Sequence, residues 1–181
     1  MIISVKTVTA AVILASPLFV TQSDPEPVVF MATSGSHRFT SPEQSRDVWQ
    51  ACGAKAPNGK LVRTFTRKEF RPAPRGTRSK LLCGSAKWGY RHIKDRHRDD
   101  WQAVANYLGQ DWRSFADWAI EQTLKAPDSA PAYRQNNDTY AYRTPIQIRD
   151  EKNKVRARYR PVVVIAAKTK NIITAYPVAQ R

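Results

Sequence analysis

Two of the three histidines of this chain, His92 and His97, lie in one short basic segment that begins at Trp88. A histidine can remove a proton from a ribose 2′-hydroxyl or return one to a leaving 5′-oxygen, because its ordinary pKa lies near neutrality. The same segment carries three cations suited to binding a phosphate backbone, namely Arg91, Lys94 and Arg96. The segment therefore supplies side chains suited to proton transfer beside a bound phosphate.

The spacing of the two histidines leaves their roles open. His97 lies on an apolar stripe between Ile93 and Trp101, whereas His92 is five positions earlier, about 140° away around an ideal helix. The two side chains are therefore expected to share one site only if the helix begins after His92. The alternatives are a core histidine at 97 and a surface histidine at 92. Two histidines at this spacing supply too few ligands for a metal site.

A second group of polar side chains lies near the end of the chain. Thr174 and Tyr176 are two residues apart, so on a strand they share one face while Ile173 and Ala175 take the other. Two hydroxyls on a sheet face beneath a histidine-bearing helix can donate hydrogen bonds to a phosphate as charge moves onto its oxygens. The alternative is that threonine and tyrosine are here only as good strand formers.

These residues must be positioned by two helices and a following sheet. Apolar residues at helical spacing predict one helix from Tyr90 to about Tyr107, ended by Gly109, and a second from the N-cap Asp111 to Leu124. A short helix is also expected to begin at Ser41. Strands are predicted over residues 61–70, 140–148, 155–166 and 172–178, with a turn at 168–171. The order predicts an α+β domain, a helical hairpin followed by an antiparallel sheet of three to four strands.

The charge of the chain points to a polyanionic partner. Thirty Lys and Arg against 15 Asp and Glu give a formal charge of +15, spread along the whole sequence. A basic surface attracts phosphate backbones by counterion release, whatever the base sequence. RNA is therefore the expected partner, with Arg143, Arg158 and Arg160 of the strand region as further contacts to flanking phosphates. The alternative is a cationic protein that adheres to nucleic acid or to anionic membranes without catalysis.

The beginning of the chain predicts export. Residues 1–23 have one early lysine and then an apolar run too short for a spanning helix, as in a signal peptide. We expect a flexible lead-in over residues 24–42, a single basic domain over 43–181, and no membrane span once the leader is removed. The two cysteines, Cys52 and Cys83, are expected to form a disulfide in an oxidising compartment. A secreted, monomeric protein is therefore predicted.

The motifs together resemble a known group of enzymes. His-Ile-x-x-Arg-His on a helix at 92–97, an antiparallel meander and a last strand reading Thr-Ala-Tyr-Pro at 174–177 are similar to the barnase, EndoU, colicin and RelE-like ribonucleases. Within this superfamily the sequence most resembles the RNase-A-like toxin domains of bacterial contact-dependent inhibition proteins. The resemblance covers residues 82–181, the C-terminal half of the chain.

The resemblance implies a reaction and roles. These toxins are metal-independent endoribonucleases in which the ribose 2′-oxygen attacks the adjacent phosphate and leaves a 2′,3′-cyclic end. The residues of this chain that match the catalytic positions are His97 or His92, Thr174 and Tyr176. The toxins also use an arginine after the histidine, for which Arg98 and Arg113 are the candidates. A cognate inhibitor protein, known as an immunity protein, is a further implied partner.

Overall fold

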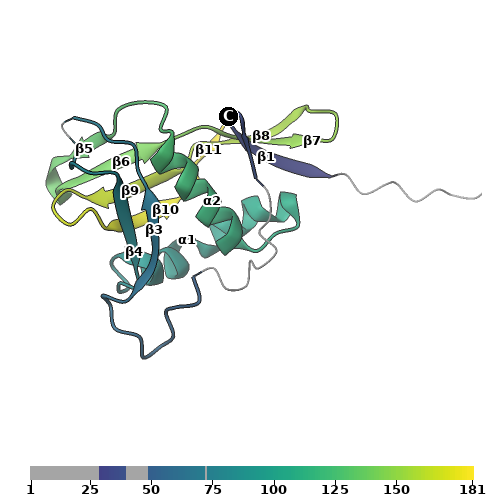
Figure 1. Cartoon of the computed structure of the whole chain (residues 1–181). Coiled ribbons are helices and arrows are strands. Elements are labelled where there is room, and N and C mark those ends of the chain that lie inside the picture. Colours follow the sequence, from purple (N-terminus) through teal and green to yellow (C-terminus); the bar gives the residue numbers. More distant parts are fainter. Residues whose placement is uncertain (1–28, 40–48, 72) are drawn as a thin grey trace, which may run out of the picture.

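The computed structural model describes residues 29–39, 49–71 and 73–181, which form an α+β structure of two α-helices and three antiparallel sheets (Figure 1). The α+β class predicted from the sequence is therefore confirmed. The expected signal peptide at 1–23 and the expected helix from Ser41 lie outside these residues. Within the described part of the chain, no helix is long and apolar enough to cross a membrane.

The two helices form the predicted hairpin. Helix α1 spans Gly89–Ala105 and continues as the short 3-10 helix η2 (Asn106–Leu108), after which Gly109 takes a left-handed conformation with φ of 61°. Helix α2 spans Trp112–Lys125, and the Asp111 side chain caps it by accepting a hydrogen bond from the Arg113 backbone N–H. Both helices bury one apolar face, which is why their apolar spacing identified them within two residues at each end.

A four-stranded sheet packs against the helices. Its strand order is β10 (Ile172–Tyr176), β9 (Val162–Ala166), β6 (Thr139–Arg143) and β5 (Ala132–Arg134), with the 3-10 helix η3 (Gln135–Asn137) between β5 and β6. One face of the sheet belongs to the main core and carries Val163, Ile165, Ile172 and Ala175. The opposite face forms a smaller cluster of Ala141, Val162 and Val164 with Ile173 and Tyr176. Strand β10 is thus an edge strand, and α1 lies against it.

A second sheet corrects two predicted strands. It contains β11 (Ala179–Gln180), β8 (Val155–Tyr159), β7 (Ile146–Asp150), β1 (Phe30–Ser34) and β2 (His37–Arg38), in that order. The single strands expected over 140–148 and 155–166 are each divided between the two sheets. The breaks lie at Pro145 and Pro161, because proline has no N–H to continue a ladder. The last strand, expected to run to 178, ends at Tyr176 and is followed by β11.

The expectation of a flexible lead-in over 24–42 is wrong for residues 30–38. Residues 30–38 form β1 and β2, and β1 pairs antiparallel with β7, where Ala32 lies opposite Ile148. Both side chains are fully buried. The segment is too short to bury its own apolar face, so its order comes from a strand more than a hundred residues later in the chain.

The third sheet is a hairpin of β3 (Leu61–Thr66) and β4 (Arg78–Leu82). The strand predicted over 61–70 ends at Thr66. Strand β4 was not predicted, because its first three residues, Arg-Ser-Lys, are polar although Ser79 and Leu81 are buried. Strand β3 is joined to α2 by ion pairs, in which Arg63 contacts Asp117 at 2.8 Å and Glu121 at 2.7 Å. These contacts place the hairpin beside the helices.

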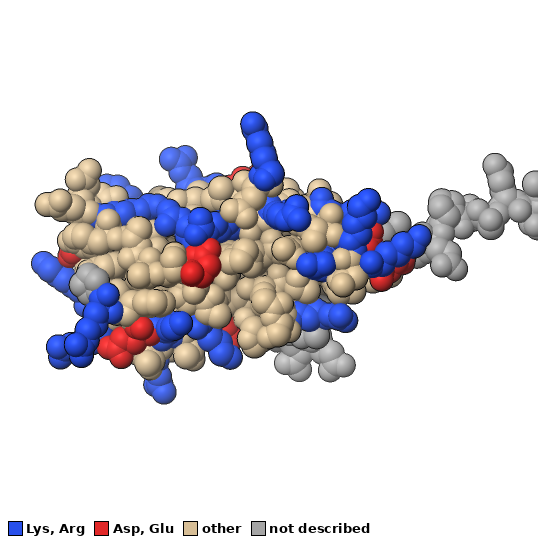
Figure 2. All heavy atoms as spheres, turned by 90° about the horizontal axis from the view of Figure 1, so that it is seen from above, with Lys and Arg blue, Asp and Glu red and all other residues tan. Residues whose placement is uncertain are grey.

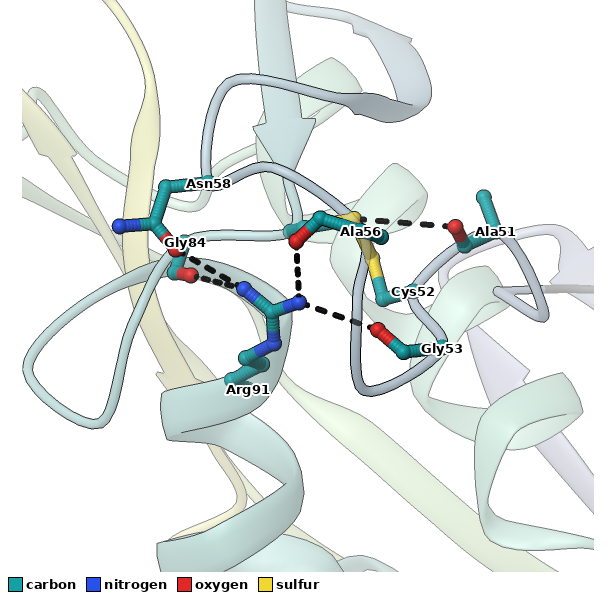
Figure 3. Close-up of a disulfide and its surroundings, with 8 residues drawn as sticks. Ala51, Cys52, Gly53, Ala56, Asn58, Gly84 and Arg91 are labelled. Carbon is teal, nitrogen blue, oxygen red and sulfur yellow. Dashed lines mark hydrogen bonds between the residues drawn. A yellow bond between two sulfur atoms is a disulfide. The ribbon is translucent and has the colours of Figure 1, made fainter.

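The predicted disulfide between Cys52 and Cys83 is confirmed, with the two Cα atoms 5.4 Å apart (Figure 3). It joins the loop before β3 to the segment that leads into α1. Arg91, on the first turn of α1, reaches back into the same loop and donates to the oxygens of Asn58, Gly53 and Ala56 and to the Gly84 carbonyl. The start of helix α1 is therefore anchored both covalently and by hydrogen bonds.

Candidate functional site

His92 and His97 lie together, which corrects the expectation drawn from their spacing. Helix α1 begins at Gly89, before His92, yet the two imidazole rings are 5.6 Å apart and nearly perpendicular. An ideal helix fixes the directions of the Cβ atoms only, whereas rotation about two side-chain bonds lets both rings turn toward the same space. A helix that includes His92 is thus compatible with a single site for both histidines.

Tyr176 of β10 completes this group of rings. Its ring stacks on His97 with centroids 5.0 Å apart and an angle of 30° between the planes. Helix and strand are held together beside this contact, because the buried Trp101 donates its indole N–H to the Ala175 carbonyl at 3.1 Å. One helix and one edge strand therefore position His92, His97 and Tyr176, which we call the ring cluster.

Thr174 shares the sheet face of Tyr176, as expected. The two residues pair with Val164 and Val162 of β9, which belong to the small outer cluster. Ile173, however, also packs against that cluster, and the expectation that it shares the other face with Ala175 is wrong. The reason is an irregularity in the β9–β10 register between Ile172 and Thr174, which interrupts the alternation of the strand.

The hydrogen bonds of the two histidines define their tautomers. His92 Nδ1 lies 2.9 Å from the Ala86 carbonyl oxygen, and His97 Nδ1 lies 3.2 Å from a carboxylate oxygen of Asp100. Neither oxygen can donate, so in both rings Nδ1 carries the hydrogen. In a neutral ring Nε2 then holds the lone pair that accepts a proton. Both rings are only partly buried, so the cluster is accessible from solvent.

The hydroxyl of Thr174 has a distinct environment. Its oxygen is shielded from solvent and has no hydrogen-bond partner among the described residues. A shielded hydroxyl without a partner costs on the order of 1–3 kcal/mol, so a ligand atom that accepts its hydrogen bond gains by that amount. Thr174 thus lies on the face of the sheet where Tyr176 meets His97, and its hydroxyl reaches a ligand once neighbouring side chains move aside.

A cationic groove adjoins Tyr176. Its volume is about 520 Å³, and its lining includes Arg143, Arg160, Tyr176 and the C-terminal Arg181. Arg143 and Tyr176 both pair with Val162, so the three side chains form one row across β6, β9 and β10. Arg160 is in part neutralised by Asp128, whose carboxylate lies 2.8 Å from the guanidinium. The groove places positive charge beside the ring cluster.

The other predicted cations are dispersed. Arg158 is exposed on β8, and Lys94 and Arg96 are exposed on α1. Arg91 is not free for a phosphate unless it leaves the oxygens described above, to which its two terminal nitrogens donate. Figure 2 shows Lys and Arg over much of one face of the molecule, with Asp and Glu in few places.

Neither arginine considered for the family's arginine role contacts the ring cluster. Arg98 is exposed and pairs with Asp99, and Arg113 lies over the ring of Trp112 at 5.4 Å on α2.

Two residues of the site, Asp100 and Arg181, were not predicted from the sequence. The spacing of three between His97 and Asp100 on a helix was a usable signal. Nothing in the sequence indicated that the last residue would line the groove. Among the described residues, no cluster of three or more histidine, cysteine or acidic side chains could hold a metal ion.

Comparison with known proteins gives relatives without a stated activity. No protein-family model matches the chain, and no solved structure matches it. The chain is 35% identical over 144 residues to the uncharacterized protein Rv0739 of Mycobacterium tuberculosis strain H37Rv. The uncharacterized protein MT0764 of strain CDC 1551 matches to the same extent. The match covers 75% of this chain and 52% of each relative, so the chain spans about half the length of the curated relatives it matches.

Proposed function

We propose that the protein is a metal-independent endoribonuclease whose active site is the ring cluster with Thr174. The observation that carries the proposal is the convergence of His92, His97 and Tyr176, with ring centroids 5.6 and 5.0 Å apart, from two separate elements. The four-stranded antiparallel sheet with helices on one face supports membership of the barnase, EndoU, colicin and RelE-like superfamily. The basic charge of +15 supports RNA as the substrate.

The proposed reaction uses the two Nε2 atoms. Neutral His92 takes the proton of a ribose 2′-hydroxyl on Nε2, and the 2′-oxygen forms a bond to the adjacent phosphorus. The bond from phosphorus to the 5′-oxygen breaks, and protonated His97 gives its Nε2 proton to that oxygen. The products are a 2′,3′-cyclic phosphate and a free 5′-hydroxyl. In this proposal His97, whose Nδ1 donates to the Asp100 carboxylate, is the acid, and His92, whose Nδ1 donates to the Ala86 carbonyl, is the base.

The remaining site residues act on the phosphate. The Thr174 hydroxyl and the Tyr176 hydroxyl donate hydrogen bonds to oxygens that gain charge as the 2′-oxygen attacks. The Tyr176 ring also holds His97 in place by stacking. Arg143 and Arg181 in the groove bind a neighbouring phosphate. Each role follows from a donor or a cation at the place where negative charge is present or develops.

The setting of the reaction is part of the proposal. A disulfide in the folded domain is typical of an oxidising compartment, which supports export of the protein. A secreted ribonuclease that is harmful to its producer requires a cognate inhibitor protein, and the cationic groove is a surface that an acidic inhibitor would cover. A monomer suffices for this chemistry, since both elements of the proposed site belong to one chain.

The test is an incubation of the purified chain with total RNA in the presence of EDTA. We expect cleavage that is insensitive to the chelator and yields fragments with 2′,3′-cyclic phosphate ends, detected by their resistance to ligation until the cyclic phosphate is opened and the resulting monophosphate is removed. Substrate RNA with 2′-O-methyl groups is expected to remain intact, because the nucleophile is blocked. If unmodified RNA also remains intact, the alternative of a cationic binding protein without catalysis replaces the proposal.

A further inference from the structure

A second cationic pocket lies at the opposite end of strand β10. Its volume is about 440 Å³, and it is lined by Thr77, Arg78, Lys80, Thr169, Lys170 and Asn171. Three of these side chains are cations, two carry hydroxyls, and none is acidic. We call it the β4–β10 pocket, because it lies between the start of β4 and the turn that leads into β10.

The fold presents these cations on one side. Strand β4 buries Ser79 and Leu81, so Arg78 and Lys80 point outward and are exposed. Lys80 and Asn171 form a parallel β-bridge, which places the outward side of β4 next to the turn before β10. No acidic residue in the described part of the chain forms an ion pair with Arg78, Lys80 or Lys170. Three unneutralised charges therefore face one pocket.

Lys170 extends from the turn toward the loop before β4. Its backbone adopts a left-handed conformation with φ of 62°, and its ammonium nitrogen lies 3.6 Å from the position that a Cβ on Gly76 would take. The side chain thus spans from the turn to that loop at the pocket lining. Hydroxyls of Thr77 and Thr169 lie on the same lining and can donate to an anion that the cations hold.

Strand β10 connects this pocket to the proposed active site. Five residues separate Asn171, in the pocket, from Tyr176, in the ring cluster, which corresponds to about 16 Å along a strand. The groove with Arg143 and Arg181 begins at Tyr176 on the far side. Positive charge therefore lies near both ends of β10, in the β4–β10 pocket before the strand and in the groove beside Tyr176 at its end.

We propose that the β4–β10 pocket binds a backbone phosphate of single-stranded RNA, several nucleotides away from the bond that is cleaved. The inference rests on the proposed function, because it takes the ring cluster as the place of cleavage. Cations at both ends of one strand can contact separate phosphates of one backbone, and proteins that hold single strands use a positively charged groove in this way. The substrate class is then an extended single-stranded RNA, and a dinucleotide is too short to reach the pocket.

The test compares two triple variants. Arg78→Gln, Lys80→Gln and Lys170→Asn together remove the charge of the pocket, with asparagine chosen at 170 because it tolerates the left-handed conformation. Lys55→Gln, Lys152→Gln and Lys154→Gln form the control, since they remove the same charge from exposed positions outside the pocket. Equal melting temperatures of the two variants and the wild-type chain establish that all three are folded.

Cleavage is measured on a dinucleotide and on a twelve-nucleotide single strand. We expect the pocket variant to lower kcat/KM for the longer RNA at least about tenfold, the effect of 1.4 kcal/mol of lost binding, and to leave the dinucleotide unchanged. The control variant is expected to retain most of the wild-type kcat/KM on both. Equal losses in the two variants on the longer RNA, or an equal loss on both substrates in the pocket variant, would overturn the inference.

A binding measurement distinguishes a failure of this inference from a failure of the proposed function. The affinity of each variant for a 2′-O-methyl twelve-nucleotide strand, which cannot be cleaved, is measured by fluorescence anisotropy across a salt series. Each lost phosphate contact reduces the salt slope by about 0.7, so the pocket variant is expected to show a slope smaller by about 0.7 than the control. Without cleavage by the wild-type chain the proposed function fails, and this binding measurement still decides whether the pocket binds RNA.

Discussion

Arg91 and His92 are neighbours on the first turn of helix α1, and their surroundings differ in kind. The guanidinium of Arg91 donates to four oxygens of the disulfide-bonded loop and of the segment before the helix. The ring of His92 has one bonded nitrogen, and its Nε2 has no hydrogen bond to a described residue. The loop joined by the disulfide is thus held by bonds within the protein, whereas Thr174, beside the ring cluster, has a hydroxyl without a partner among the described residues.

The difference shows how to distinguish structural from functional polar groups in this chain. A polar group whose partners are all within the protein stabilises the fold, and its loss appears in the free energy of unfolding. A group that is positioned but not bonded contributes little to stability, and its loss is expected to appear in the rate of a reaction. The following substitutions test this separation from both sides.

The largest effect is expected from His97→Ala. Loss of a general acid typically lowers the rate by a factor of about a hundred or more, so RNA cleavage should fall at least that far while RNA affinity changes little. His92→Ala is expected to act similarly. The measurement is kcat for a defined RNA together with anisotropy binding, with the exposed His37→Ala as a matched control. If His97→Ala keeps full activity and His92→Ala loses it, the assignment of the acid to His97 is wrong.

The hydroxyls of the site should have smaller effects on the rate. Tyr176→Phe keeps the ring that stacks on His97 and removes only the hydroxyl, and Thr174→Ala removes a hydroxyl that has no partner among the described residues. Each is expected to lower kcat by a factor on the order of ten to a thousand, with no loss of thermal stability. Tyr133→Phe, at an exposed tyrosine of β5, is the control. A lower melting temperature with unchanged kcat would assign both hydroxyls to the fold.

The opposite result is expected for Arg91→Ala. The substitution leaves several carbonyl oxygens of the anchoring loop without a donor, so the free energy of unfolding should fall by about 2 kcal/mol, as measured by urea denaturation. Activity of the folded variant should remain near the wild-type value. Lys94→Ala, at an exposed cation on the same helix, should change neither. A loss of kcat without a loss of stability would instead show that Arg91 belongs to the RNA-binding site.

The last prediction concerns the pH dependence of stability at a buried carboxyl group. Burial raises the pKa of Asp117 to about 6, although the Arg63 guanidinium and the Trp49 indole N–H oppose this shift. Between about pH 4 and pH 6 the folded chain then holds a proton that the unfolded chain has lost, so stability falls as pH rises through this window. Asp117→Asn is expected to flatten that dependence, which amounts to about 1.4 kcal/mol for each unit by which the pKa is raised, in urea denaturation across pH. An unchanged slope would contradict the assignment.

Local patterns predicted the helices and failed for the long strands. The apolar stripes of α1 and α2, with Asp111 and Gly109 at their ends, depend on neighbours within a few residues. The division of residues 140–148 and 155–166 between two sheets depends on which strands lie alongside, and a proline at each break does not by itself indicate a change of sheet. The ordering of 30–38 by β7 is non-local in the same way.

For the candidate site, too, local patterns predicted the residues but not their arrangement. The residue types alone indicated His92, His97, Thr174 and Tyr176, because histidine near neutral pH and paired hydroxyls are suited to phosphate chemistry. Their convergence could not be predicted, since the helical angle argued against a shared site for the histidines and the rings meet through side-chain rotation. Arg181 reaches the groove because β11 pairs with β8 and brings the end of the chain beside Tyr176.

The sequence by itself determined the basic character of the protein, its two helices, its disulfide partners and the residue types of the candidate site. These properties depend on composition, on periods of a few residues and on the presence of two cysteines alone. The tertiary structure decided which polar groups form hydrogen bonds within the protein and which do not. It also placed a cationic pocket at each end of β10. Those outcomes follow from contacts between segments far apart in the chain, for which no local pattern carries a signal.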